Sequence, residues 1–374
     1  MFTQADLDLF CAASHDRNPL HRSPEYARRT AFGQPVVYGV LGALAGLGAL
    51  PGRPGERLAG LTLEFMHPLF VGVEYRVQTD GQSFALYEGR RLATRGTARF
   101  APASVGVAGV TDGTAPRSEA AVRTEDELVP GLTVEGDYAP AAGPLQALAE
   151  RFGVDAGHLA ALLFASYLVG MELPGRDALF QQAAFTFEPP ALTGGFRAVV
   201  TAYDRRFQLL RVRAELAGVA TVETRAFVRQ PTPALSAGAL AELLPPSDGM
   251  AGLVALVIGA SRGLGAAVAR ALASQGCRVA AAYSRSAAEA EQLAAETAGA
   301  VVPVQGDGAD LAWCLALRER IRQEYGRLDL LVCSAAPPLL PLSLDPDTVL
   351  RAERYVADSL ALTSRPLAAF LPLL

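Results

Sequence analysis

The chain has 374 residues, which is too long for one ordinary domain, so we expect two or three folding units. Hydrophobic residues make up 51% and charged residues 19% of the chain, a balance that excludes an intrinsically disordered protein. The net charge of −5 and the scattering of the 33 lysines and arginines along the chain argue against nucleic acid as a partner.

The N-terminus and the cysteines are typical of a cytoplasmic protein. Residues 1–10 include acidic residues and lack the basic start of a signal peptide. The longest apolar stretch, at 36–50, is shorter than the roughly 20 residues that a bilayer span requires, so it predicts a buried helix and no membrane attachment. The four cysteines lie far apart with no C-x-x-C pair. They predict reduced thiols, with neither disulfides nor a metal site.

Two consecutive blocks, at 1–108 and 131–230, share one order of elements. Each has an apolar helix that ends in Pro-Gly and is followed by strand-like runs rich in β-branched and aromatic residues. The helix is expected at 36–50 in the first block and at 158–172 in the second. The strands are expected at 61–65, 73–77, 83–87 and 92–100, and then at 179–187, 196–203, 209–216 and 219–228. One helix wrapped by an antiparallel sheet is the hotdog pattern, so this duplication predicts an α+β double hotdog.

The third block, at 252–374, alternates strands and helices instead. Its pattern predicts strands at 253–258, 278–283, 300–304 and 328–333, and helices at 264–275, 287–297, 311–325 and from near Thr348. Alternating β and α units imply a parallel, doubly wound sheet, so we expect an α/β Rossmann-type domain that is incomplete in this chain. Segments rich in Gly, Pro, Ser and Ala, at 101–131 and 230–252, are predicted to be the linkers.

The first candidate site is a polar loop at 14–21, which reads S-H-D-R-N-P-L-H. It is followed by Tyr26-Ala27 and by a stretch from Phe32 to Gly39 that reads F-G-Q-P-V-V-Y-G. This order resembles the motif of MaoC-like hydratases, in which S-G-D-x-N-P-L-H precedes A-x-x-x-x-F/Y-G-x-P-I/V-x-H-G at the start of the hotdog helix. The resemblance implies an (R)-specific hydratase or dehydratase of enoyl and 3-hydroxyacyl thioesters.

The resemblance also implies roles for the matching residues. Asp16 and His21 would flank one water or hydroxyl and act as the acid–base pair, in an order that the sequence leaves open. Asn18 and Pro19 would make the loop between them rigid. Gly39 would offer its backbone N–H to the thioester carbonyl as an oxyanion donor, helped by the helix dipole. The structural alternative is that Asp16 is a capping or turn residue and His21 an ordinary surface histidine.

The chain departs from the motif at two positions. His15 stands where the family usually has Gly, and Tyr38 where it usually has His. We expect the backbone to adjust around His15 with its ring in solvent, the alternative being a third polar group near the site. Tyr38 is expected to pack or to hydrogen-bond structurally.

The second block contains no copy of the polar loop. We therefore expect a non-catalytic hotdog that completes a pseudo-dimer and shapes an acyl tunnel. Phe164, Tyr167 and Met171 are expected either to line that tunnel or to pack in the core. His158 is expected to be a helix-end residue, and His67, beside a proline, a turn residue.

The second candidate site reads L-V-I-G-A-S-R-G-L-G from Leu256 to Gly265, an apolar strand that leads through a glycine turn into a helix. It resembles the G-x-x-x-G-x-G turn of the short-chain dehydrogenase/reductase family, which implies a pyrophosphate at the helix N-terminus. The basic residues in the turn and after the second strand suit a 2′-phosphate, so NADP(H) is expected rather than NAD. The implied cofactor-binding residues are Gly259, Ser261, Arg262, Gly263, Gly265, Arg285 and Asp307.

The same resemblance weakens further along the chain. The family's N-N-A-G sequence is replaced by Cys333-Ser334-Ala335-Ala336, and no Tyr-x-x-x-Lys follows before Leu374. In the family that Tyr and Lys supply the proton and the polarisation for carbonyl reduction. We therefore expect no oxidoreductase activity from this chain unless a longer parent chain supplies them.

The leading hypothesis is a hydro-lyase of fatty-acid or polyketide-type assembly. It would dehydrate (3R)-hydroxyacyl thioesters, or hydrate enoyl thioesters, without a cofactor at the lyase site. CoA or an acyl carrier protein would carry the substrate, and a homodimer is an open option. The alternatives are an NADP-dependent 3-ketoacyl thioester reductase, a non-catalytic thioester-binding scaffold, and a hotdog thioesterase. The helix at 36–50 contains no acidic residue, which disfavours the thioesterase.

Overall fold

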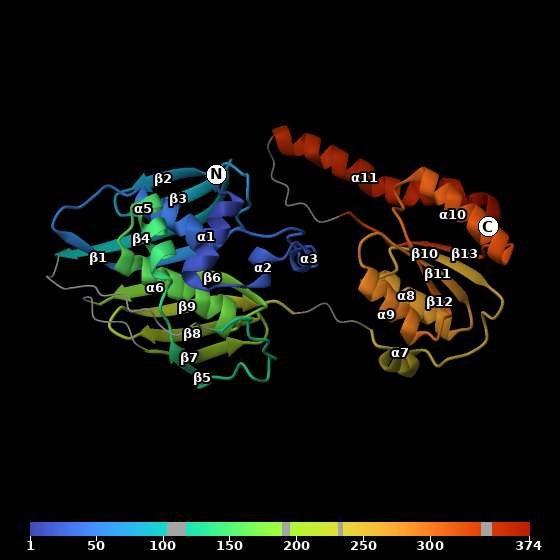
Figure 1. The fold of residues 1–374 in the computed structure, drawn as a ribbon, viewed down its shortest axis with the longest axis horizontal. Helices are drawn as coiled ribbons and strands as arrows, with labels where there is room; N and C mark the ends of the chain where they lie inside the picture. The colour runs from blue at the N-terminus through green and yellow to red at the C-terminus, as the bar shows by residue number, and fades with distance from the viewer. Residues whose placement is uncertain (103–116, 189–194, 231–234, 338–345) are drawn as a thin grey trace. The chain divides into compact units, whose positions relative to one another are not determined.

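The computed structural model describes residues 1–102, 117–188, 195–230, 235–337 and 346–374. These residues form two units, Met1–Gln230 and Pro231–Leu374 (Figure 1). The predicted linkers at 101–131 and 230–252 fall partly on residues 103–116 and 231–234, which lie outside the described residues, as does the predicted end of the first block at residue 108.

The first unit is built on one antiparallel sheet with the strand order β2-β3-β4-β1-β6-β9-β8-β7-β5 in the described residues. The order β1-β4-β3-β2 in the first half is repeated as β6-β9-β8-β7 in the second. Antiparallel pairing of β1 with β6, from Gly60 opposite Thr186 to Glu64 opposite Gln182, joins the two halves. This topology is the expected duplication. The strands are β1 Glu56–Phe65, β2 Arg76–Asp80, β3 Ser83–Glu88, β4 Arg91–Pro102, β5 Thr133–Asp137, β6 Ala178–Phe187, β7 Gly195–Asp204, β8 Leu209–Leu216 and β9 Ala220–Val228.

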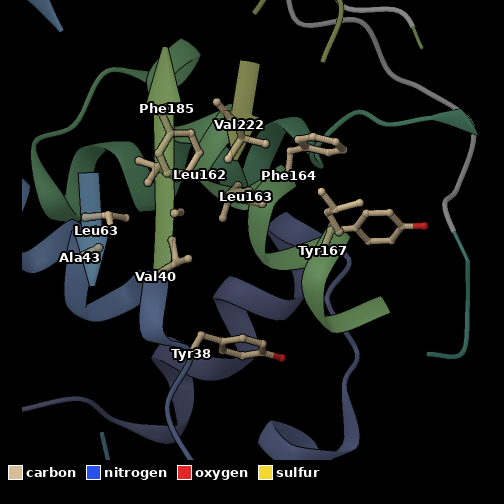
Figure 2. Packing of buried hydrophobic residues seen from close by; sticks show 14 of the residues in the cluster. Tyr38, Val40, Ala43, Leu63, Leu162, Leu163, Phe164, Tyr167, Phe185 and Val222 are labelled. Atoms are coloured by element: carbon tan, nitrogen blue, oxygen red, sulfur yellow. The ribbon is translucent and has the colours of Figure 1, made fainter. Parts of the chain in front are cut away.

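Each half contributes one apolar helix to the core. Helix α4 (Gly39–Gly48) packs on β2, β3 and β4, and helix α6 (Ala156–Tyr167), which continues into a π-helical turn η1 (Leu168–Glu172), packs on β6 and β9. The two helices also contact each other, so they cover the same face of the sheet. Figure 2 shows Val40 and Ala43 of α4 in one cluster with Leu162 and Leu163 of α6. The double hotdog fold is thus confirmed.

Several elements were not predicted. They are α1 (Gln4–Ser14), α2 (Pro19–Arg22), α3 (Pro24–Ala27), α5 (Ala142–Phe152), β5 and α7 (Ala237–Leu243). Helix α1 did carry a sequence signal, because Thr3 and Asp6 form a capping box in which each side chain accepts from the other residue's backbone N–H. Helix α5 has Ala141 as its N-cap and no side-chain cap, so no such signal was present.

The second unit contains a parallel sheet with the order β12-β11-β10-β13 in the described residues. Its central strand β10 is buried on both faces: Leu256 and Ile258 belong to one core, and Ala255 and Val257 to another. Helices on both faces of a parallel sheet confirm the Rossmann-type fold. The strands are β10 Val254–Ile258, β11 Arg278–Tyr283, β12 Val301–Gln305 and β13 Leu330–Cys333. The helices are α8 Gly263–Ser274, α9 Ala287–Glu296, α10 Leu311–Tyr325, α11 Pro346–Phe370 and η2 Leu371–Leu373.

Across the described ranges, no single helix is both long enough and apolar enough to cross a bilayer. Only the bent pair Ala142–Phe152 and Ala156–Glu172 reaches that apolar length jointly, across a bend of 110°.

Candidate functional site

A pocket of about 280 Å³ lies in the first unit, and both halves line it. The first half contributes Asp16, Asn18, His21 and Gly39, while the second half contributes Ser166, Gly170 and part of β6. The structure therefore brings the residues predicted for acid–base chemistry and for oxyanion binding to one cavity. Pro19 does not line the pocket and is instead the first residue of α2.

The polar loop starts at the C-terminus of α1. His15 is the C-cap, with φ 58° in the left-handed region, and its backbone N–H donates to the carbonyl of Cys11. Glycine adopts this conformation most easily, which explains the Gly of the family motif. The backbone adjusts as expected, but the ring is half-buried beside the backbone of Ala139 rather than in solvent, and burial lowers its pKa.

Asn18 fastens the loop to the second half of the unit. Its side-chain oxygen accepts from the backbone N–H of Leu20 at 3.0 Å. Its side-chain nitrogen donates to the carbonyl of Gly170 at 2.8 Å and to that of Gly175 at 3.1 Å. Asn18 is the N-cap of α2 and Pro19 its first residue, so both residues fix the loop between Asp16 and His21.

Asp16 is 1% exposed, and each of its carboxylate oxygens accepts a hydrogen bond. The hydroxyl of Ser166 donates to Oδ2 at 2.7 Å, and the backbone N–H of Asn18 donates to Oδ1 at 3.0 Å. Burial away from water raises the pKa of Asp16 to about 6, while the two hydrogen bonds oppose that rise. Asp16 is buried and is not the N-cap of α2, but its bond from the Asn18 N–H is a turn contact, so this residue has a structural role in the loop as well as a place in the pocket.

His21 is fixed with one nitrogen towards the backbone. Its Nδ1 lies 2.8 Å from the carbonyl oxygen of Val36. Since a carbonyl only accepts, Nδ1 carries the proton in the neutral ring and Nε2 is left as a proton acceptor. The ring stacks on Tyr38 with 4.0 Å between ring centres. Burial lowers the pKa of His21 to about 4, and the positive charge of Arg229 contributes to the same direction.

Tyr38 and Gly39 connect the loop to α4. Tyr38 is fully buried and its hydroxyl donates to the backbone carbonyl of Asp16 at 2.7 Å, which is the structural role expected for it. Gly39 is the first residue of α4, where a backbone N–H has no acceptor within the helix. A Cβ at this position would lie 2.9 Å from the ring of Phe65, so the close approach requires glycine.

Two residues of the site were missed in the sequence. Ser166 holds the carboxylate of Asp16, and Gly170 leaves room for it, because a Cβ at Gly170 would lie 2.6 Å from Oδ1 of Asp16. Both belong to the second block. This block therefore contributes residues to the candidate site, in addition to completing the double hotdog. A serine within the apolar helix expected at 158–172 was the available signal.

The other residues with a predicted role lie in the core, at the start of a helix or in the pocket. Phe164, Tyr167 and Met171 pack in the hydrophobic core and do not line the pocket. His158 lies at the start of α6, with Nε2 3.0 Å from the carbonyl of Leu58, as expected for a helix-end residue. His67 is exposed and lines the pocket, so a turn role alone does not describe it.

The second unit forms the predicted strand–turn–helix. Strand β10 ends at Ile258, Gly259 turns with φ 85°, and α8 begins at Gly263 with φ 56°. A Cβ on Gly265 would lie 2.2 Å from the carbonyl oxygen of Gly259, and one on Gly259 would lie 2.6 Å from the backbone nitrogen of Ala335. The turn therefore excludes side chains and leaves backbone N–H groups at the start of α8 open to an anion.

The other predicted nucleotide-binding residues lie after the carboxyl ends of neighbouring parallel strands. Ser261 and Arg262 follow β10, Arg285 follows β11 and Asp307 follows β12. Arg262, Arg285 and Asp307 are exposed, and Ser261 is half-buried. Oδ1 of Asp307 accepts from the backbone N–H of Ala309 at 2.9 Å. Folds of this kind bind nucleotides at the carboxyl ends of the parallel strands, so the positions of these residues fit a nucleotide cofactor.

Comparison with known proteins defines the class of each unit. The family model for MaoC-like domains matches residues 1–94, and the model for short-chain dehydrogenases matches residues 253–348. The chain therefore belongs to the MaoC-like family through its first unit and carries a short-chain dehydrogenase domain in its second.

Particular relatives agree with this division. An (R)-specific enoyl-CoA hydratase of Aeromonas caviae is 40% identical over 103 residues, which cover 26% of this chain and 75% of the relative. A D-threitol dehydrogenase of Mycolicibacterium smegmatis is 45% identical over 87 residues, 22% of this chain and 33% of the relative. A solved short-chain dehydrogenase of Burkholderia cenocepacia in complex with NADP has 28% identity and a TM-score of 0.29, and the match covers 33% of this chain and 50% of that one. The chain thus spans about a third of this dehydrogenase relative.

Proposed function

We propose that the first unit is a hydro-lyase that hydrates enoyl thioesters to (3R)-hydroxyacyl thioesters, or catalyses the reverse dehydration. The observation that carries the proposal is that Asp16 and His21 line one pocket, with the pKa of the carboxyl raised and that of the imidazole lowered. The relative from Aeromonas caviae, an (R)-specific enoyl-CoA hydratase, supports the reaction and favours CoA as the carrier. An acyl carrier protein, as in fatty-acid or polyketide assembly, is the alternative carrier.

Near neutral pH the two groups are both proton acceptors. Asp16 is ionised because its pKa of about 6 lies below 7, and His21 is neutral because its pKa is about 4. A water molecule that donates one hydrogen bond to the carboxylate and one to Nε2 of His21 turns a lone pair towards the β-carbon. Gly39 donates its N–H to the thioester oxygen, where negative charge develops during the addition.

The direction of the two pKa shifts favours one order of proton transfer. Asp16 has the higher pKa and is the stronger base, so it takes the proton while the oxygen of water bonds to the β-carbon. The resulting enolate carbon then takes this proton back from Asp16, so that one water is added and no net proton is consumed. His21 orients the water throughout. Dehydration follows the same steps in reverse.

The loss of enoyl absorbance of crotonyl-CoA tests the proposal. We expect Asp16→Asn and His21→Ala each to lower kcat by at least about a hundredfold, the low end of general acid–base contributions. Asp126→Asn, at an exposed aspartate paired with Arg205, is the matched control and should retain full activity. Full activity in both site variants would remove Asp16 and His21 from the mechanism, whereas inactivity of the wild type would remove the reaction itself.

We further propose that the second unit binds NADP(H). The glycine turn at Gly259–Gly265 would hold the pyrophosphate, and Arg262 and Arg285 would face the 2′-phosphate. NADP(H) supplies hydride chemistry when bound, so a 3-ketoacyl thioester reductase is the second candidate function. The match to the short-chain dehydrogenase family gives no support to the expectation that reductase activity is absent.

Fluorescence titration with NADPH tests the second unit. Gly265→Ala should weaken binding by at least about tenfold, because the new Cβ collides with the turn. Gly238→Ala, at an exposed helical glycine with nothing within 4 Å of the new Cβ, should leave the affinity unchanged. Equal affinities in both variants would show that NADPH does not use this turn.

A further inference from the structure

The entrance of the pocket is marked by the exposure of its lining residues. Asp16 is 1% exposed, whereas Met66 is 46% and Phe227 is 40% exposed, and His67, which follows Met66, is also exposed. The three exposed residues Met66, His67 and Phe227, together with the half-buried Gln181, are named here the rim. Any substrate whose carrier is too large for the cavity must pass this rim to bring its thioester to Asp16.

The rim comes from three neighbouring strands. Met66 and His67 follow the end of β1, Gln181 lies in β6, and Phe227 lies in β9. Strand β6 pairs with β1 on one side and with β9 on the other, and Leu179 lies opposite Phe227. The rim is therefore a continuous edge and not a chance grouping of exposed residues.

Gln181 occupies a β-bulge in this edge. The pairing of β6 with β9 passes from Phe180 directly to Gln182, which leaves Gln181 as the extra residue. Bulges next to active sites change the direction of a side chain, and here four consecutive residues, from Ala178 to Gln181, line the pocket. A regular strand would alternate such residues between its two faces.

Gln181 and His67 are the polar side chains of the rim, and in the part of the chain that the structure describes neither makes a side-chain hydrogen bond. The glutamine amide is both donor and acceptor, and the neutral imidazole is too. Deeper in the pocket, Leu20, Val36 and Leu69 form an apolar wall that suits an acyl chain. The two polar side chains of the rim thus suit the polar part of the substrate that remains outside.

We propose that Gln181, together with His67 of the same rim, binds an amide group of the pantetheine-type arm that links the acyl thioester to its carrier. This inference rests on the proposed function, since CoA and acyl carrier proteins both present acyl groups on such an amide-bearing arm. Gln181 and His67 are then positioning residues for carrier-linked substrates. They hold the arm while Asp16 and His21 act on the acyl group.

Substrates with and without the arm test the proposal. Gln181→Leu should raise KM for crotonyl-CoA and crotonyl-pantetheine about tenfold at similar kcat, in the range of one neutral hydrogen bond. It should leave kcat/KM for S-ethyl thiocrotonate, which has no amide, unchanged. Gln182→Leu, at the adjacent residue that does not line the pocket, is the control and should behave as wild type on all three. Gln181→Met serves as a second variant if the leucine protein does not fold.

Two results would overturn the proposal. One is an equal loss on the amide-free thioester, which indicates a structural role for Gln181, and the other is no loss on either kind of substrate. Calorimetric binding of crotonyl-pantetheine separates this inference from the reaction. If the wild type binds it about tenfold more tightly than Gln181→Leu but hydrates nothing, the arm site stands and the hydro-lyase proposal fails.

Discussion

The hydroxyl of Ser166 donates a hydrogen bond of 2.7 Å to Oδ2 of Asp16, although the two residues lie 150 positions apart and belong to different halves of the first unit. The bond is buried, so it acts at low dielectric, and it stabilises the ionised form of the carboxyl. The proposed base therefore depends on a helix from the half that lacks the polar loop.

Replacing Ser166 with alanine should raise the pKa of Asp16 further, because the ionised carboxylate loses a hydrogen bond. Since the proposed reaction needs the ionised form, the acid limb of kcat/KM for crotonyl-CoA hydration should move to higher pH. We expect a move of roughly one pH unit, as a hydrogen bond to a charged group contributes about 1.5 kcal/mol. Ser83→Ala, at a half-buried serine whose hydroxyl hydrogen-bonds that of Thr97 outside the pocket, should leave the profile in place. An unmoved limb in Ser166→Ala would mean that Asp16 does not titrate in the reaction.

The wild-type pH profile follows from the two shifted groups. Asp16 must be ionised and has a pKa of about 6, so activity should be complete at pH values well above 6 and fall as the pH drops through that value. The fall should be roughly tenfold per pH unit, the slope for a single protonation. His21 remains neutral in this window because its pKa is about 4. Activity that rises on acidification would instead require a protonated Asp16 in the starting complex.

Gly170→Ala should lower activity strongly and destabilise the first unit. The new Cβ would lie 2.6 Å from Oδ1 of Asp16, inside the π-helical turn, so the carboxylate or the helix must move. Displacement of the base should reduce kcat by at least about a hundredfold, as loss of the group itself does. Gly238→Ala, in the exposed helix α7, should stabilise the protein by roughly 0.5–1 kcal/mol, the normal gain for alanine in a helix. Thermal unfolding and the hydration assay measure the two effects, and an active Gly170→Ala protein would contradict the close contact.

Asp16→Asn should not destabilise the protein at pH 8, although it removes a hydrogen-bonded residue. The folded state raises the pKa of this carboxyl from 3.8 to about 6, so folding disfavours the ionised form. That penalty is absent below about pH 4 and complete above about pH 6, where it amounts to about 3 kcal/mol at most. Denaturant unfolding should therefore show the variant more stable than wild type at pH 8 and not at pH 4. A wild type that is more stable at both pH values would show that the carboxylate stabilises the fold.

Local patterns in the sequence predicted the fold well because the main helices, strands and turns of each unit are encoded by residues close together in the chain. The long apolar runs predicted α4 and α6, and the alternation of β-branched and aromatic residues predicted the strands. The glycines at 259, 263 and 265 are required by a turn that spans only a few residues. Strand β5 was missed because it has only five residues, and helix α5 because it has no side-chain N-cap, although Gly153 at its C-cap was an available signal. The sequence could not predict that Gly170 and Ser166 contact Asp16. That contact depends on how two helices meet, which no spacing in one segment encodes.

The pairing of β1 with β6 places both halves of the pocket in a single polypeptide. In a symmetric homodimer every substitution appears twice, once on each side of the twofold axis. Covalent duplication removes that constraint, because a change in α6 has no counterpart in α4. One half can therefore carry the polar loop while the other supports the carboxylate of Asp16 and lines the entrance, without either feature having to appear twice in the described residues.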